Sequence, residues 1–234
     1  MTVAEPQQQK TIPIPHYVES LYWWAYVHPF AARVFDNQFA VNAILWGNYN
    51  RLRDAALEDL GAVLPGKTLQ VGCCYGDLTP HVAERVAKGG GTLDVIDVVP
   101  IQLKNLRRKV PPGAPVNPLL MDAVALDMPP ATYDRVLIFL LLHEQPQACR
   151  EQTLREALRV LKPGGKIVIV DYARPARWNP ARFTTIPLYS LLKPYAVDVW
   201  AKGLSAVIPN AMAGRTWKTT SYFGGLFEKF VSTG

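Results

Sequence analysis

The sequence predicts an α/β fold in which helices cover both faces of a mostly parallel sheet, preceded by an N-terminal helical layer. From Lys67 onward, short apolar segments alternate with segments of helical character, which is the pattern of a parallel sheet with crossover helices. Hydrophobic residues make up 49% and charged residues 19% of the 234 residues, a globular composition. This length fits one domain with a full hydrophobic core, and no internal repeat is visible.

The predicted elements follow one another in a regular order along this core. Strands are expected at 67–71, 92–98, 114–121, 133–142 and 166–172, and helices at 77–88, 101–109 and 147–161. The segment Lys162-Pro163-Gly164-Gly165 is expected to stop the last of these helices. Residues 219–231, around Gly224-Gly225, are expected to form an antiparallel hairpin at the sheet edge.

The N-terminal part of the chain has a different character. We expect a mobile tail at 1–10 and an aromatic helical segment at 11–60 that covers the site, followed by the core at 61–234, all within one domain. Two helices broken near Pro29 are expected in this segment. Aromatic residues of this kind pack on a core or lie at a membrane–water interface, and one helix can do both. They are Tyr22, Trp23, Trp24, Tyr26, Phe30, Phe35, Phe39 and Trp46.

Charge and cysteine content narrow the class of protein. The net charge is +6 and the pI is about 9.2, but no aromatic-interleaved RNA motif accompanies the basic residues, so nucleic acid is disfavoured as a partner. Three cysteines give neither a disulfide framework nor metal-ligand spacing, which favours an intracellular protein. No apolar run reaches the length of a membrane span, and residues 1–10 lack the features of a signal peptide.

A basic and aromatic segment follows the fifth predicted strand. Arg174, Arg177 and Arg182, together with Trp178, would suit the anionic headgroups of a lipid surface. A solvated loop is the ordinary alternative for such a segment.

Two acids and a glycine-containing turn point to a nucleotide site. Gly72 and Gly76 follow the first strand, where a turn lets the backbone approach a ligand, although the usual run of three glycines is broken. Asp97 ends the second strand about 20 residues further on and could accept both ribose hydroxyls, or it could cap the next helix. Asp122, after the third strand, lies where an adenine amino group would need an acceptor. Their neighbours Val98 and Ala123 are assigned to the same pocket.

These segments carry a family resemblance. LQVGCCYGDLT, VIDVVPIQL and LRVLKPGG resemble successive motifs of class I S-adenosylmethionine (SAM) methyltransferases, and the chain is most similar to the ubiquinone/menaquinone C-methyltransferases. The aromatic N-terminal block, with GCCYGDLT, resembles more narrowly the RquA family of rhodoquinone biosynthesis proteins. Members of that family replace a ubiquinone methoxy group by an amino group, with SAM as amino donor and manganese (Mn²⁺) assisting.

The resemblance implies a seven-stranded Rossmann-like sheet with SAM and Mn²⁺ as cofactors and ubiquinone as substrate. It implies a cytoplasmic enzyme that associates peripherally with the inner membrane. An ordinary quinone C-methyltransferase and a non-catalytic SAM- or lipid-binding accessory protein are the alternatives.

The turn departs from the common methyltransferase motif. Gln70 stands where that motif has an acid. A carboxylate at this position would help to keep the α-amino group of SAM protonated, and an ammonium has no lone pair with which to attack. The neutral amide of Gln70 removes this effect. The alternative is drift at a tolerant position. The bulk of Cys73, Cys74 and Tyr75 should displace SAM from a standard pose, and the Tyr75 hydroxyl could contact a quinone carbonyl. The cysteines are expected to be packing residues.

Further cofactor and metal ligands are expected at the same edge. Asn42, Asn48 and Tyr49 could line the cofactor or quinone entrance, because the N-terminal layer covers that edge in related enzymes. The complete set of cofactor-binding candidates is Gln70, Gly72, Cys73, Gly76, Asp97, Val98, Asp122, Ala123 and Tyr49.

His143 and Glu144 follow the fourth strand and Asp171 ends the fifth, so all three should lie at the carboxyl edge of the sheet. One histidine with two carboxylates suits manganese. Alternatively, His143 and Glu144 cap the next helix and Asp171 pairs with an arginine. Asp127, in a proline-rich loop, is a less favoured ligand. His143 or Tyr75 would accept the proton of the attacking amine.

Overall fold

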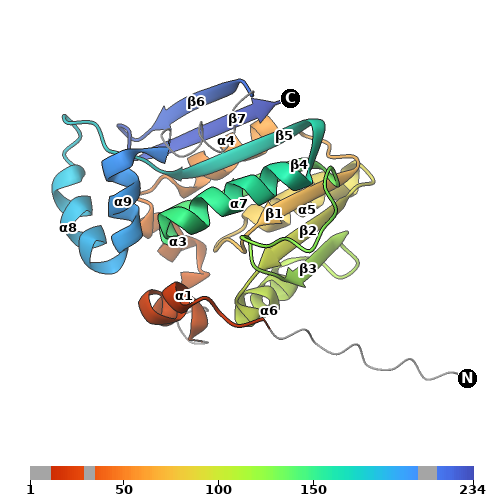
Figure 1. Cartoon of the computed structure of the whole chain (residues 1–234), viewed down its shortest axis with the longest axis horizontal. Helices are drawn as coiled ribbons and strands as arrows, with labels where there is room; N and C mark the ends of the chain where they lie inside the picture. Colours follow the sequence, from red (N-terminus) through yellow and green to blue (C-terminus); the bar gives the residue numbers. More distant parts are fainter. Residues whose placement is uncertain (1–11, 29–34, 205–214) are drawn as a thin grey trace, which may run out of the picture.

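The structure is a computed structural model that describes residues 12–28, 35–204 and 215–234. One seven-stranded sheet lies at its centre, with the strand order β3-β2-β1-β4-β5-β7-β6 (Figure 1). Strands β1 to β5 are parallel, whereas β7 pairs antiparallel with β5 and β6. The predicted fold class is confirmed. The strands are β1 (Lys67–Val71), β2 (Thr92–Asp97), β3 (Val116–Leu120), β4 (Tyr133–Phe139), β5 (Leu161–Tyr172), β6 (Trp217–Tyr222) and β7 (Phe227–Thr233).

Helices cover both faces of this sheet. Side chains of α4 and α5 belong to one apolar core, and those of α7 belong to a second core on the opposite face. The core helices are α4 (Tyr49–Leu60), α5 (Leu78–Lys88), α6 (Pro100–Lys109) and α7 (Gln147–Val160). The other described helices are α1 (His16–Leu21), the π-helix η1 (Trp23–Val27), α3 (Gln38–Ile44), the 3₁₀ turn η2 (Leu142–Glu144), α8 (Arg182–Leu192) and α9 (Pro194–Lys202).

The central strands are apolar throughout because both of their faces are covered. In β5, Val168 and Val170 belong to one core while Ile167 and Ile169 belong to the other. Successive side chains of a strand point to opposite faces, so a run of apolar residues fills both cores at once. This places the carboxyl ends of the parallel strands at one well-supported edge.

Two predicted boundaries differ from the structure. Helix α7 ends at Val160, and β5 begins at once with Leu161, so residues 162–165 bulge out of β5 between its pairs with β4. A bulge accommodates Pro163, which has no N–H to donate. Strand β4 ends at Phe139 rather than at residue 142, because Leu140 adopts a left-handed backbone with φ +54° and the chain turns into η2.

The N-terminal and C-terminal helices were predicted less well. In place of two helices, the N-terminal segment contains α1, η1 and α3 before α4; Pro29 and residues 1–10 lie outside the described residues. Residues 182–202 form α8 and α9, for which the sequence analysis predicts no element. Among the described helices, none is long and apolar enough to cross a membrane.

Candidate functional site

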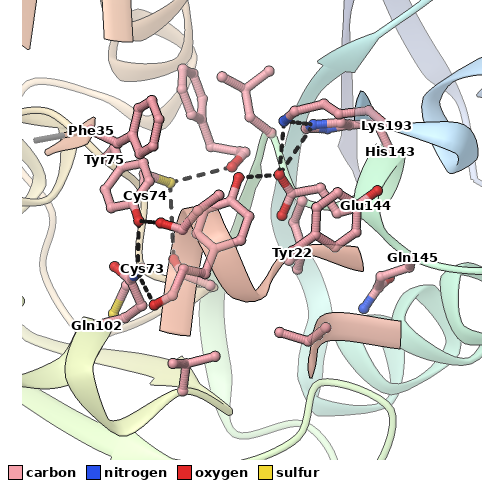
Figure 2. Close-up of a pocket in the computed structure, with 18 of the residues that line it drawn as sticks. Tyr22, Phe35, Cys73, Cys74, Tyr75, Gln102, His143, Glu144, Gln145 and Lys193 are labelled. Atoms are coloured by element: carbon pink, nitrogen blue, oxygen red, sulfur yellow. Dashed lines mark hydrogen bonds and ion pairs between the residues drawn. The ribbon is translucent and has the colours of Figure 1, made fainter. Parts of the chain in front are cut away.

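A cavity of about 610 Å³ lies at the carboxyl ends of β1, β2, β4 and β5. Its floor is formed by residues that follow these strands, and its other walls come from α1, η1 and α3 on one side and α8 on the other. This is the size range of small-molecule and cofactor sites, and the carboxyl edge of a parallel sheet is where such ligands bind. Figure 2 shows that aromatic rings from several elements converge around it.

The turn after β1 presents its backbone to this cavity. Gly72 and Gly76 have φ values of +88° and +84°, which residues other than glycine rarely adopt. A Cβ on Gly76 would overlap the hydroxyl of Tyr49, and that hydroxyl accepts a hydrogen bond from the Leu78 amide at 2.9 Å. Gly72 is part of the cavity wall, whereas Gly76 and Tyr49 lie behind the turn and support it.

Gln70 also lies behind the turn. Its side chain is buried, and its amide nitrogen donates to the carbonyl of Gly72 at 3.0 Å and to the hydroxyl of Thr79 at 2.9 Å. A carboxylate has no proton to donate to that carbonyl, so the amide at this position stabilises the observed turn. Gln70 therefore shapes the turn and does not belong to the cavity wall.

Asp97 lies at the end of β2 and faces the cavity. Its carboxylate accepts hydrogen bonds from the amides of Cys73 and Val99, both at 2.8 Å. Burial raises the pKa of Asp97 to about 6, although both amide bonds act in the opposite direction. An ionised carboxylate offers about four lone pairs, so positions remain for the two ribose hydroxyls of a nucleoside.

Asp122 and Ala123, which follow β3, complete this end of the cavity. One Asp122 carboxylate oxygen accepts from the Val124 amide at 3.1 Å, which fixes the local turn. The structure thus brings most of the predicted cofactor residues into one wall, while three lie behind it: Gln70, Gly76 and Tyr49. The wall residues are Gly72, Cys73, Asp97, Val98, Asp122 and Ala123.

The entrance asparagines and Asp127 lie elsewhere. Asn42 accepts from the Tyr49 amide, and buried Asn48 donates to the carbonyls of Leu45 and Trp46. Both are structural residues of the α3–α4 connection, and neither lines the cavity. Asp127 lies outside the cavity wall as well.

The two thiols of the turn are poor nucleophiles. Burial raises the pKa of Cys74 to about 12, and burial also raises the pKa of Cys73 well above its ordinary value. The Cys74 thiol lies 3.3 Å from the carbonyl oxygen of Phe139, to which it donates. Both side chains stay protonated at neutral pH and act as packing residues.

Tyr75 ties the turn to the N-terminal segment. Its hydroxyl donates to the carbonyl of Ala25 at 2.5 Å and accepts from the amide of Gln102 at 2.9 Å, and its ring stacks on Tyr26 at 5.4 Å (Figure 2). Burial raises the pKa of Tyr75, so the phenol stays neutral at physiological pH. Its single proton is engaged with Ala25 and is not free for a quinone carbonyl, and a neutral phenol is a poor proton acceptor, so neither predicted role of Tyr75 is favoured.

A polar cluster occupies the opposite end of the cavity. His143 is buried between Asp171 and Lys193: its Nδ1 lies 2.8 Å from Asp171 Oδ1, and its Nε2 lies 2.9 Å from Lys193 Nζ. Lys193 Nζ also donates to Glu144 at 3.0 Å, and Glu144 accepts from the hydroxyl of Tyr26 (Figure 2). Because Asp171 and Lys193 fix the two ring nitrogens, Nδ1 carries the proton and Nε2 accepts from the lysine.

The predicted metal site is not formed. His143, Glu144 and Asp171 do lie together, but the ammonium of Lys193 lies against both His143 Nε2 and Glu144, where a cation would be coordinated. The oxygens of Asp171 accept from the amides of Leu142 and Tyr172 in addition to His143. In the described part of the chain, no group of three or more histidine, cysteine, aspartate or glutamate side chains could hold a metal. The residues present therefore do not fit Mn²⁺ here.

The electrostatics of the cluster follow from this arrangement. Burial alone would raise the pKa of Glu144, but the Lys193 ammonium, together with the hydrogen bond from the Tyr26 hydroxyl, holds it at about 2. Glu144 is thus ionised and paired with a cation at neutral pH. The alternatives considered for these residues do not hold: α7 begins without a side-chain cap, and Asp171 pairs with His143 rather than with an arginine.

Neither Lys193 nor Arg150 is predicted from the sequence as a residue of the site. Lys193 lies at the junction of α8 and α9 and is the one basic residue between Arg182 and Lys202 in the sequence. A single lysine in a mostly apolar segment is the feature of the sequence that could have indicated its role. Arg150 is buried, and its guanidinium donates to the carbonyl of Leu142 and to Asp198 at 2.8 and 2.7 Å. It thereby holds η2, which carries His143, against α9.

Comparisons with known proteins agree with this geometry. Residues 68–165 match the family described as "Methyltransferase domain". An uncharacterized methyltransferase of Synechocystis sp. is 30% identical over 156 residues, covering 66% of this chain and 68% of that protein. The ubiquinone/menaquinone biosynthesis C-methyltransferase of Bordetella avium is 30% identical over 152 residues, covering 64% of this chain and 57% of that protein.

The fold has a solved counterpart. The N-methyltransferase NodS of Bradyrhizobium japonicum, in complex with S-adenosyl-L-homocysteine, superimposes with a TM-score of 0.61 at 16% identity, covering 94% of this chain and 99% of that one.

Proposed function

The chain belongs to the class I SAM-dependent methyltransferase family, and on that premise we propose that it aminates ubiquinone to rhodoquinone with SAM as the amino donor. Quinones enter the proposal because several relatives, including the Bordetella avium protein, are named as quinone C-methyltransferases. The amination itself rests on the resemblance to rhodoquinone biosynthesis proteins and on the chemistry of the cavity.

The observation that carries the proposal is a single cavity with two chemically different ends. One end has the turn after β1 with Asp97 and Asp122, which suit the ribose and adenine of SAM. The other end has aromatic and aliphatic side chains with one ammonium, Lys193, among them. An apolar ring with a carbonyl oxygen fits that second end, and the two ligands would meet within one enclosure. Residues 11–60 would act as the cover over this enclosure.

Lys193 supplies the group that the reaction needs at the quinone. Its ammonium has three protons, of which His143 and Glu144 accept two, so the third can donate to a ligand in the cavity. When the neutral α-amine of SAM adds to the methoxy-bearing carbon, negative charge develops on the conjugated carbonyl oxygen. A preformed ammonium beside that oxygen stabilises the charge. His143, held by Asp171, fixes the position of the ammonium.

The proposed first step balances without an added oxidant. A nitrogen–carbon bond forms, an electron pair moves onto the carbonyl oxygen, and the pair returns as the methoxy group leaves with the amine proton as methanol. The nitrogen–Cα bond of SAM must then break by elimination: the nitrogen keeps the bonding electron pair and gains a proton, while the β-carbon loses a proton and the carbon skeleton leaves as an alkene. No step is assigned to manganese, because His143 and Glu144 pair with Lys193 and Asp171 pairs with His143.

Quinone C-methylation is the second candidate, and the similarity to the Bordetella avium enzyme favours it. In that reaction the reduced ring attacks the methyl carbon of SAM, so S-adenosylhomocysteine forms and the quinone gains one methyl group. The same cavity could hold both ligands. The two reactions differ in their products, which makes them easy to separate.

The test is a product analysis with SAM labelled with nitrogen-15 at its α-amine. Purified protein is incubated, with and without manganese, with short-tailed ubiquinone and separately with a reduced quinone that has a free ring position for methylation. The quinone products are analysed by mass spectrometry. Amination predicts a labelled quinone that lacks one methoxy group. A methylated quinone, or no product from a protein that binds SAM, would refute amination.

Variants of Lys193 make the test residue-specific. Lys193→Met should lower the turnover number about 10²- to 10³-fold, the size of effect seen when one oxyanion donor is lost. Lys193→Arg keeps a cation and should retain more activity. Equal activity in all three proteins would refute the role of the ammonium.

A further inference from the structure

Helix α8 exposes an apolar surface instead of a charged one. Phe183 and Leu191 are 75% and 80% exposed, and Leu188 and Leu192 are also exposed. All residues of α8 from Phe183 to Leu192 are described, and none of the exposed positions carries a charge. A solvent-facing helix normally places charged residues on its outer face, so this surface is not built for water.

Helix α3 continues the same surface from a distant part of the sequence. Phe39 is 87% exposed, and Ile44 and Trp46 are partly exposed on the same segment. The hydroxyl of Tyr189 in α8 donates to the carbonyl of Ile44 at 3.1 Å, so the C-terminal end of α3 contacts α8. Figure 1 shows both helices at the same end of the molecule. Two separate segments thus form one apolar surface, the α3–α8 surface.

The α3–α8 surface surrounds an opening of the cavity. Four of its side chains are both partly exposed and part of the cavity wall: Ile44, Trp46, Leu188 and Leu192. These four apolar side chains therefore connect the α3–α8 surface with the cavity wall. The apolar side chains around the opening would be exposed to water unless they contact an apolar partner, such as the acyl chains of a bilayer.

The segment that leads into α8 supplies a complementary charge. Residues 172–182 contain three basic residues and no acidic residue. Arg174 and Arg177 are exposed, and Trp178 beside them is 77% exposed. Basic residues attract anionic lipid headgroups, and tryptophan favours the boundary between headgroups and acyl chains.

We propose that the α3–α8 surface docks on a bilayer that contains anionic phospholipids, with the cavity opening facing the acyl chains. The membrane is the occupant that fits, because an apolar surface bordered by arginines and an exposed tryptophan matches a headgroup layer over hydrocarbon. The direction of quinone entry rests on the proposed function, but the docking does not. A lipid substrate could then enter the cavity without crossing water.

The experiment is sedimentation of the full chain with vesicles. Wild-type protein should bind vesicles of phosphatidylglycerol and phosphatidylethanolamine, and should bind pure phosphatidylcholine vesicles more weakly, with a difference that shrinks at high salt. Phe183→Glu and Leu191→Glu should each weaken binding to the anionic vesicles at least about tenfold. Neither residue lines the cavity.

Val63→Glu is the matched control, because Val63 is a 54% exposed apolar residue in the loop between α4 and β1. It should bind vesicles like wild type, and circular dichroism should show that all variants are folded. Wild-type protein that stays in the supernatant, or α8 variants that bind as well as Val63→Glu, would overturn the proposal.

Activity separates this proposal from the proposed function. Leu191→Glu should process short-tailed ubiquinone without vesicles at the wild-type rate but lose turnover of long-tailed quinone embedded in vesicles. If no variant and no wild-type protein aminates either quinone while vesicle binding follows the expected pattern, the proposed function fails and the docking surface stands.

Discussion

Replacing Lys193 by methionine is expected to destabilise the protein by about 3 kcal/mol at neutral pH. Methionine keeps most of the apolar stem and removes the ammonium that pairs with Glu144 at 3.0 Å. The pKa of Glu144 is about 2 in the folded protein against an ordinary value of 4.5, and a difference of that size corresponds to about 3 kcal/mol of stability. Lys193 is the main group that lowers this pKa, so most of that stability depends on it.

The pH dependence follows from the direction of this pKa. A carboxylate whose pKa is lowered by folding stabilises the protein fully above its unfolded pKa, and this stability is lost as the pH falls through the folded pKa. The difference between wild type and Lys193→Met should therefore be largest at pH 7 and shrink to about half near pH 3. Other carboxylates are common to both proteins and cancel in the difference.

Urea unfolding followed by circular dichroism at both pH values measures this difference. The double variant Lys193→Met with Glu144→Gln removes the unpaired buried charge and should recover part of the stability at pH 7. A difference below about 0.5 kcal/mol at pH 7, within the range of an ordinary surface substitution, would refute the argument. So would a difference that stays constant on acidification.

Three further predictions concern the SAM end of the cavity. The pKa of Asp97 is about 6, and its ionised form is the acceptor for the ribose hydroxyls. SAM affinity, measured by calorimetry, should therefore fall up to about tenfold for each pH unit below 6. This pH dependence should disappear in Asp97→Asn. Gly76→Ala should abolish SAM binding or lower the free energy of unfolding by about 1–3 kcal/mol, because Gly76 has a φ of +84° and an added Cβ would overlap Tyr49. Thermal stability and SAM affinity equal to those of wild type would contradict this. Cys74, with a pKa of about 12, should resist iodoacetamide at pH 8 in the folded protein and react in urea, as peptide mass spectrometry can show.

The sheet and the position of its site could be predicted from the sequence. Apolar segments such as 133–139 have the length and composition of buried parallel strands, and the carboxyl ends of such strands must meet at one edge. Asp97, Asp122 and His143 follow strands, so the sequence alone placed them at that edge. The hairpin around Gly224-Gly225 was predicted for a similar local reason, since its glycines take left-handed turns.

Some details of the turn could not be predicted. Gln70, Gly76 and Tyr49 lie close to the cavity in sequence or in space, yet they support the turn from behind. Which side of a turn a residue occupies depends on the φ values of its glycines and on what packs beneath it. A sequence motif shows neither these φ values nor this packing.

The sequence by itself determined the alternation of strands and helices, and with it the fold class and the edge at which ligands bind. Only the tertiary structure showed that Lys193, about 50 residues beyond His143, takes the place expected for a metal. It also showed that α3 and α8 join into one apolar surface around the cavity opening. Local periodicity records how each segment buries its own side chains, whereas contacts between distant segments arise only when the whole chain has packed.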